Sequence, residues 1–282
     1  MQRIIECNYD IKNVKSKEGF TPYYALVKNE SSYEDIEKMV KILKEHGFIN
    51  TYKTLSNENL LDICLANRNK NLLEILFKNK VLDIKEAYIN RNKLIHKITE
   101  IIKDSEELGV FYMEREISSI KEEMANNDDG SSFEDALEYI QQEERQIQNL
   151  KRNVKDILSY VIKESENNGF SINEKNDDGD TPLMLLISSG QALMLEYFMA
   201  YNPNILIENE YGENALCYAI KYGRLDVFEK LFSLINNSQN EASKLLVNII
   251  YNLPDDERRK AITLITIEDI IETLIPLSLI HI

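Results

Sequence analysis

The fold is decided by two stretches, DDGDTPL at residues 177–183 and EYGENAL at residues 210–216, which carry one pattern 33 residues apart. Another pair of glycines, Gly190 and Gly223, keeps the same interval. Glycine is unfavourable inside helices and favourable where φ is positive, so glycines that recur at a fixed interval mark recurring turns. The sequence therefore predicts a repeat of about 33 residues in which short turns alternate with helices.

The same frame occurs nearer the N-terminus, as EGFTPY at residues 18–23 and GFIN at residues 47–50, and again as GFSIN at residues 169–173. This pattern resembles the ankyrin-repeat family, whose repeats read D-G-x-T-P-L-H-x-A-A near the start and G-A-D-I-N at the end. The resemblance is clearest at residues 176–234 and extends to residues 17–84. It implies an all-α fold, an ankyrin-repeat α-solenoid of about five helix-turn-helix repeats with short hairpin loops.

The third repeat is predicted to be interrupted. Ile95 and His96 take the family's Leu-His positions, but the closing pattern that begins at Gly169 arrives about 55 residues late. We expect an insertion at residues 104–149, made of two helices broken at residues 126–132. Residues 81–150 hold 17 acidic and 8 basic side chains, a net charge of −9 out of −15 for the chain. The insertion is therefore predicted to be an acidic helical hairpin that leaves the repeat stack.

This interpretation divides the chain into five parts. They are an N-terminal segment at 1–16; repeats one and two with the first helix of repeat three at 17–103; the hairpin insertion at 104–149; the rest of repeat three with repeats four and five at 150–239; and a helical C-terminal cap at 240–282.

The charge restricts the class of partner. With 48 acidic and 33 basic residues the chain has a net charge of −15 and a pI near 4.8. Phosphate binding depends on Lys and Arg, so we expect no nucleic-acid partner and no anionic membrane partner. A protein with a basic or mixed basic and apolar surface is the favoured partner. The oligomeric state is not predicted.

No cofactor, metal or catalytic residue is expected. The three cysteines, Cys7, Cys64 and Cys217, are far apart and form no C-x-x-C or Cys/His ligand spacing. Neither acidic loop, at 126–130 or at 176–179, has the ligand spacing of a calcium-binding EF-hand. The resemblance implies a structural role for His96, and no nucleophile or phosphate-loop motif is present. The charged N-terminus argues against a signal peptide, which together with the cysteine usage favours a cytoplasmic, reducing compartment.

The ankyrin resemblance implies a concave groove, lined by hairpin tips and first helices, as the partner-binding face. Transferred by position, the tip candidates are Asp178, Asp180, Glu210, Tyr211 and Glu213. The first-helix candidates are Met184, Leu185, Ser188, Tyr218, Lys221 and Tyr222. Tyrosines among carboxylates would give aromatic anchors with electrostatic steering of a basic partner.

The primary prediction is thus a non-enzymatic protein-interaction scaffold. Three alternatives stay open at this point. One is a host-directed effector of an intracellular microbe; the richness of the chain in Asn, Ile and Lys indicates an AT-rich genome, which bears on its source and not on its activity. Another is the recognition arm of a longer protein whose catalytic or effector domain lies outside this chain. In the third, the acidic hairpin itself associates with a partner or with a second copy.

Overall fold

The computed structural model describes residues 16–17, 21–27, 31–48, 59–82, 94–102, 104–126 and 133–235. Within these ranges the regular structure is helical and contains no β-strand. The chain divides into two compact units, Met1–Ser171 and Ile172–Ile282. In chain order the helices are η1 (Tyr24–Leu26), α2 (Tyr33–Glu45), α3 (Leu60–Ala66), α4 (Lys70–Lys78), η2 (Leu94–Glu100), α5 (Asp104–Asn126), α6 (Phe133–Asn167), α7 (Pro182–Ser189), α8 (Ala192–Met199), α9 (Ala215–Lys221) and α10 (Leu225–Ile235).

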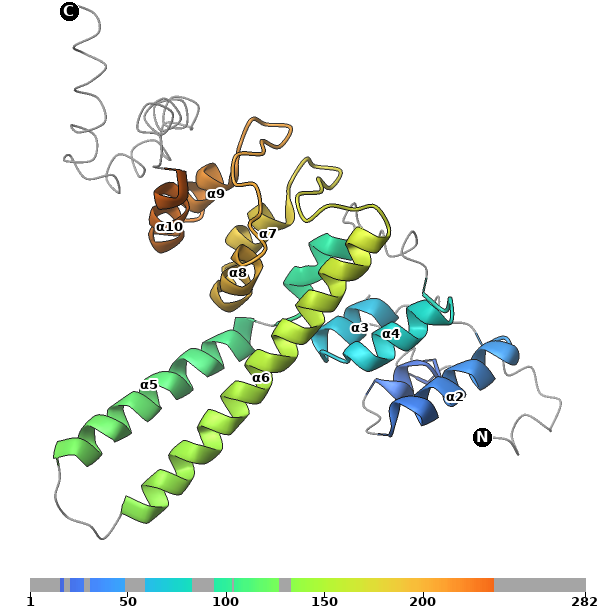
Figure 1. Ribbon diagram of the computed structural model, residues 1–282, viewed down its shortest axis with the longest axis horizontal. Helices are drawn as coiled ribbons and strands as arrows, with labels where there is room; N and C mark the ends of the chain where they lie inside the picture. The colour runs from blue at the N-terminus through green and yellow to red at the C-terminus, as the bar shows by residue number, and fades with distance from the viewer. Residues whose placement is uncertain are drawn as a thin grey trace, which may run out of the picture. The chain divides into compact units, whose positions relative to one another are not determined.

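The first unit is a stack of helical pairs. Its successive pairs are η1 with α2, α3 with α4, and η2 with the C-terminal part of α6. The second members pack in a row, α2 on α4 and α4 on α6, while α3 packs on η2 (Figure 1). Helices with one apolar face bury it only against neighbouring pairs, which is how a solenoid forms a continuous core. The fully buried side chains include Leu43, Leu65, Leu72, Leu76, Ile95 and Ile98.

Two first helices of the first unit are 3₁₀ helices where the repeat pattern predicts α-helices. At Thr181 the hydroxyl oxygen accepts from Met184 N at 3.4 Å, and an α-helix follows. At the equivalent Thr21 the buried hydroxyl has no hydrogen-bond partner among the described residues, and Tyr24 N bonds to Thr21 O at 3.0 Å. The missing cap and the i→i+3 bonds thus go together at this position, so Pro22 does not open an α-helix there.

A largely buried ion pair joins the second and third pairs. The ammonium of Lys97 in η2 donates to Asp62 of α3. The other carboxylate oxygen of Asp62 accepts from Asn59 N at 3.1 Å, and Asn59 Oδ1 accepts from Asp62 N at 2.9 Å. This reciprocal capping box fixes the start of α3 and also holds the carboxylate in place for Lys97.

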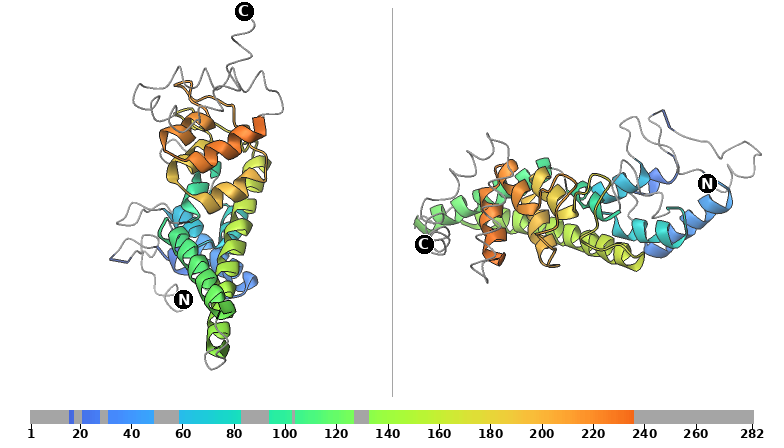
Figure 2. Two further views of the ribbon diagram at one scale, coloured as in Figure 1. Left: turned by 90° about the vertical axis from the view of Figure 1, so that its left-hand side faces the viewer. Right: turned by 90° about the horizontal axis from the view of Figure 1, so that it is seen from above.

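α5 and α6 form an antiparallel helical hairpin, and they lie side by side in the views of Figures 1 and 2. Their seam is a separate small core of Val110, Ile117, Ile140 and Ile147. Ion pairs of Lys121 with Glu144 and of Lys151 with Glu114 cross the hairpin at its surface. α6 runs unbroken from Phe133 to Asn167, so no structural boundary falls at residue 149, and the limits of the insertion stay a prediction.

The base of the hairpin is attached by one arginine. Arg68, in the turn between α3 and α4, donates two hydrogen bonds of 2.9 Å to the carboxylate of Glu106 and one of 3.1 Å to Ile101 O. A bidentate guanidinium–carboxylate pair is geometrically specific as well as charged. It therefore helps to fix the direction in which α5 leaves the stack of helical pairs.

Within residues 172–235, the part of the second unit that the structure describes, there are two α-helical pairs, α7 with α8 and α9 with α10, and α7 packs on α9. Thr181 and Asn214, 33 residues apart, are the N-caps of α7 and α9. The 33-residue frame therefore gives equivalent helix starts, as the sequence predicts. Most of the predicted N-terminal segment, the loop at 127–132 and the predicted cap at 240–282 lie outside the described residues.

Candidate functional site

Each hairpin tip of the second unit is organised by one asparagine. Asn176 Oδ1 accepts from the backbone N–H groups of Asp178 at 3.0 Å and Asp180 at 2.8 Å. Asn209 Oδ1 does the same for Tyr211 at 2.9 Å and Glu213 at 3.0 Å. These side-chain turns hold the tip backbone in a fixed conformation before any partner arrives.

The two tips also touch. Gly179 has φ +81°, and a Cβ atom at this position would lie 2.6 Å from Glu210 N. That distance is below any normal non-bonded contact, so only glycine permits the approach. The tips at 176–180 and 209–213 are therefore stacked against each other and form one surface.

Tyr218 and Asp180 make a polar link between the two repeats. The Tyr218 hydroxyl donates to Asp180 Oδ1 at 2.6 Å, and Asn209 Nδ2 donates to the same oxygen at 2.9 Å. Burial, with the hydrogen bond to Asp180 adding to it, raises the pKa of Tyr218 far above its usual range. With 7% of its surface exposed, Tyr218 is a structural link and not an exposed anchor.

A charged and aromatic patch lies beside this link. Glu213 accepts from Lys221 Nζ at 2.9 Å, and Lys221 Nζ lies 5.6 Å from the centre of the Tyr218 ring. The ring centres of Tyr218 and Tyr222 are 5.7 Å apart. The tyrosine at 222 is half exposed, so it continues the aromatic surface outward from the buried ring at 218.

The predicted partner-binding residues fall into three groups. Met184 is 1% exposed and lies in the core, where its sulfur accepts a hydrogen bond from Thr181 N. Met184 and Tyr218 are therefore buried residues and not part of the exposed surface. The half-buried residues are Asp178, Asp180, Leu185, Ser188 and Glu213. The exposed residues are Glu210, Tyr211, Lys221 and Tyr222.

Tyr201 and Leu206 are among the exposed apolar side chains of the second unit that the sequence pattern did not indicate. Both follow α8 in the segment that leads to the next tip, where the repeat consensus places its closing signature. A repeat frame assigns such residues to a turn but does not show whether their side chains face the core. The sequence therefore does not indicate them as part of a binding surface.

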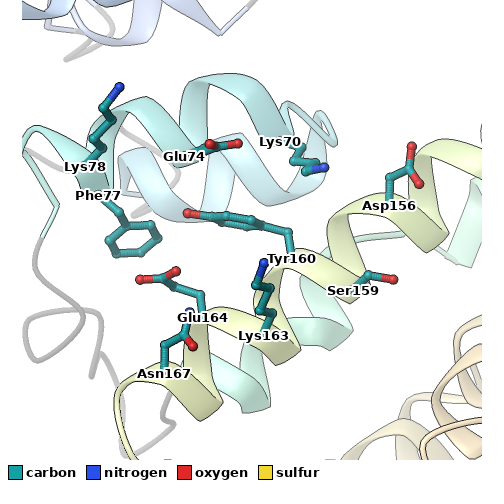
Figure 3. Close-up of a pocket in the computed structure, with 10 residues that line it drawn as sticks. All are labelled: Lys70, Glu74, Phe77, Lys78, Asp156, Ser159, Tyr160, Lys163, Glu164 and Asn167. Carbon is teal, nitrogen blue, oxygen red and sulfur yellow. The ribbon is translucent and has the colours of Figure 1, made fainter.

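The first unit has a pocket that was not predicted either. It has a volume of about 500 Å³ and lies between α4 and α6, with Tyr160 near its middle and Phe77 toward one end (Figure 3). Burial, followed by the nearby carboxylates Glu164 and Glu74, raises the pKa of Tyr160. Its lining comes from segments about 90 residues apart, so no local sequence pattern indicates it.

Within the described residues, no group of three or more His, Cys, Asp or Glu side chains is placed to hold a metal ion. Cys64 and Cys217 are buried free thiols, and desolvation raises the pKa of each. A thiol held in its protonated form is a poor nucleophile, so neither cysteine is suited to catalysis. In the same part of the chain, none of the helices is both long and apolar enough to span a bilayer.

Comparisons with known proteins agree with the repeat frame. Residues 148–243 match the family model for ankyrin repeats in three copies. A comparison with curated proteins found no match. A chain in the solved complex of the Bd0816 predatory endopeptidase from Bdellovibrio bacteriovorus with immunity protein Bd3460 is similar at 13% identity, over 81% of this chain and 88% of that chain. Its TM-score of 0.38 is too low to support an argument.

The family match begins inside α6 and continues through α10, so it spans the third to fifth predicted repeats. It includes the stacked tips and the cap positions described above. Ankyrin repeats are protein-interaction modules and typically not catalytic. The sequence pattern, the helical pairs and the family match together identify residues 148–243 as ankyrin repeats.

Proposed function

We propose that this chain is a non-enzymatic scaffold that binds a partner protein through the tips at 176–180 and 209–213 together with the exposed side of α9, here called the tip face. The observation that carries the proposal is Tyr211. Its side chain is 80% exposed on a tip whose backbone is already fixed by Asn209. A rigid, exposed aromatic loses little conformational entropy on binding, which is typical of an anchor residue.

The charge around this anchor favours a basic partner. Glu210 is exposed beside Tyr211, and Asp178 is half-buried on the neighbouring tip. Asp180 and Glu213 already accept hydrogen bonds from Tyr218 and Lys221, so they shape the tip face more than they contact a partner. Exposed carboxylates increase the rate of encounter with a basic surface, in a manner that salt weakens.

The cysteines support an intracellular, reducing environment for this function. Both described thiols, Cys64 and Cys217, are unpaired and buried. Secreted proteins of this size usually form disulfides from such residues, whereas reduced thiols persist in the cytoplasm. We therefore propose a cytoplasmic location for the interaction.

A binding experiment on the intact chain tests the tip face. A partner peptide is first selected from a display library on immobilised full-length chain, and its dissociation constant is then measured for variants. Replacing both Tyr211 and Tyr222 with alanine should weaken binding by about 2 kcal/mol or more, mainly through faster dissociation. Tyr112→Ala, at a tyrosine that is 61% exposed on α5 in the other unit, should leave the affinity unchanged if the tip face is the binding site.

Two results would count against the proposal. If the Tyr211→Ala/Tyr222→Ala variant bound the partner with unchanged affinity, the two tyrosines would not be anchor residues. The selected partner could also prove to be acidic and to bind faster when Glu210 is replaced by lysine. That result would contradict the proposed preference for a basic partner.

One observation favours the hairpin as a second candidate interaction element. Phe111 and Tyr112 are adjacent on α5, with 57% and 61% of their surfaces exposed and their ring centres 5.8 Å apart. They lie outside the seam that Val110 and Ile117 form with α6. If the hairpin is the binding element, Phe111→Ala/Tyr112→Ala weakens the selected partner and the tip-face variant does not.

A further inference from the structure

The pocket between α4 and α6 has half-buried acidic and aromatic side chains and exposed basic ones. Its half-buried lining residues include two acids and two rings: Glu74, Glu164, Phe77 and Tyr160. The exposed lining residues include its lysines: Lys70, Lys78 and Lys163. Water screens an exposed charge more strongly than a partly buried one. The glutamates therefore act more strongly inside the pocket than the lysines do.

The charges are also separated along the pocket. The hydroxyl of Tyr160 points toward the end where Phe77 and Glu164 lie, whereas Lys70 and Lys163 lie toward the other end (Figure 3). After burial, the charge of Glu164 and then that of the α4 glutamate raise the pKa of Tyr160. The hydroxyl end of the tyrosine is therefore a negative environment, which favours a cation.

Helix α2 carries the same arrangement with a lysine bound to it. Tyr33 and Glu37 are four residues apart on α2, which also packs on α4. The pair of Tyr160 and Glu164 on α6 has the same spacing. At the α2 pair, Lys78 Nζ is 2.9 Å from Glu37 Oε1 and 5.9 Å from the centre of the Tyr33 ring. Among the described residues, no cation lies over the ring on α6 in this way. The α2 pair thus indicates which group such a pair holds, a lysine ammonium.

We propose that the pocket binds a lysine side chain of a partner protein. Its ammonium contacts Glu164, with Glu74 on the facing helix, and its carbon stem lies on the rings of Tyr160 and Phe77. Asn168 Nδ2 donates to Oε1 of Glu164 at 3.3 Å, and a carboxylate accepts several hydrogen bonds, so this one does not exclude the ammonium. The α6 pair would then hold an external lysine as the α2 pair holds an internal one.

The family match supports a protein as the source of the ammonium. The α6 side of the pocket, from Asp156 to Asn167, falls within residues 148–243, which match ankyrin repeats. Ankyrin repeats are protein-interaction modules, so the ammonium is assigned to a protein side chain and not to a free amine. The pocket lies in the first unit and the tip face in the second, so each site has its own test.

Nuclear magnetic resonance on the ¹⁵N-labelled full-length chain tests the pocket with a defined probe, the capped tripeptide acetyl-Ala-Lys-Ala-amide. The expected result is a set of saturable chemical-shift changes that are largest at residues 70–78 and 156–167. Norleucine in place of the lysine keeps the carbon stem without the charge, and should weaken binding by about tenfold, the effect of about 1.4 kcal/mol. Butylamine carries the ammonium without a peptide and should bind more weakly than the tripeptide.

A matched pair of glutamate variants on α6 completes the test. Glu164→Gln should weaken the tripeptide by about tenfold, since a charge-assisted contact is lost. Glu166→Gln removes the same charge from an exposed position of the same helix outside the pocket, and should leave binding unchanged. Lys163→Gln removes a competing positive charge and should not weaken binding.

Several outcomes would overturn the proposal. They are equal binding of the lysine and norleucine peptides, an equal loss in Glu164→Gln and Glu166→Gln, weaker binding in Lys163→Gln, or shifts confined to the tip face. Butylamine that binds as tightly as the tripeptide would overturn the assignment to a partner protein.

Discussion

At the scale of single residues, the contact between the two tips depends on Gly179. Gly179 and Gly212 have nearly the same backbone conformation, φ +81° and +76°, but only at Gly179 would a Cβ atom meet neighbouring backbone. Gly212→Ala should therefore lower the free energy of unfolding by about 1–2 kcal/mol, the cost of a left-handed conformation for alanine. Gly179→Ala adds the clash with Glu210 N and should be clearly more destabilising.

Urea unfolding of the two glycine variants measures this difference. If the two variants lost the same free energy of unfolding, the tips would not touch in solution. The two tips would then not form one surface.

The hydrogen bond from Tyr218 to Asp180 gives a second residue-scale prediction. Tyr218→Phe keeps the ring but removes the hydroxyl, and should lower the free energy of unfolding by about 2 kcal/mol at neutral pH, as expected for a bond to a charged acceptor. Tyr222→Phe removes a hydroxyl from a half-exposed tyrosine one turn further along and should change the free energy of unfolding little. An equal effect of the two substitutions would contradict the role given to Tyr218.

The raised pKa of Tyr218 also predicts a dependence on alkaline pH. Its pKa is above the ordinary value of 10.0 in the folded state, so its contribution is complete below pH 10 and is lost as the pH rises further. Burial raises the pKa of Tyr23 to about 12, which acts in the same direction. Unfolding measured from pH 8 to 11 should show stability falling above pH 10, less steeply in Tyr218→Phe than in Tyr222→Phe. Parallel curves would contradict this.

At this scale the sequence predicted some residues well and others poorly. The caps Thr181 and Asn214 were predictable, because a cap is a local interaction over three residues. Tyr218 and Met184 were assigned to the surface, although both are buried. A repeat pattern shows which side of a helix a residue occupies. It does not show that the tyrosine reaches Asp180, 38 residues earlier, or that the methionine closes the cap of its own helix.

At the scale of elements, α5 carries a weak point. Gly109 lies inside this helix, and a Cβ atom there would meet nothing within 4 Å. Alanine stabilises an open helical position relative to glycine by about 0.5–1 kcal/mol. Gly109→Ala should therefore slow hydrogen exchange of the α5 amides and leave α7 to α10 unchanged. Faster exchange in α5 would show that the position is not a regular helical one.

The independence of the hairpin is a second element-scale prediction. Its seam is formed by its own residues, and the ion pair of Arg68 with Glu106 attaches it to the α3–α4 turn. Replacing residues 105–149 with a short Gly/Ser turn should leave the remaining helices folded with cooperative unfolding. The turn variant Arg68→Gln in the intact chain serves as the control, since it removes the attachment alone. Loss of helical circular dichroism beyond the deleted residues would contradict the prediction.

The elements also show where local patterns stop being informative. Glycine spacing and apolar stripes predicted the helical pairs and the hairpin, since these depend on neighbours in sequence. They did not predict that η1 and η2 are 3₁₀ helices, nor the pocket between α4 and α6. At η1 the 3₁₀ geometry goes with the missing cap at Thr21, whose hydroxyl has no partner among the described residues. The space between α4 and α6 depends on the packing of second helices that are distant in sequence.

At the scale of the whole molecule, the chain has a net charge of −15, and its ankyrin repeats lie within residues 148–243. The tip face of the second unit is proposed for a basic partner. This surface is tested within the second unit, because the two units are separate compact bodies.

Hydrogen–deuterium exchange of the intact chain, with and without the partner peptide selected on it, tests the central claim most directly. The tip face predicts new protection at residues 209–222, including the amides of Tyr211 and Glu213, with a weaker effect at 176–180. Protection confined to α5 and the N-terminal half of α6, with the tips unchanged, would contradict it and assign recognition to the hairpin.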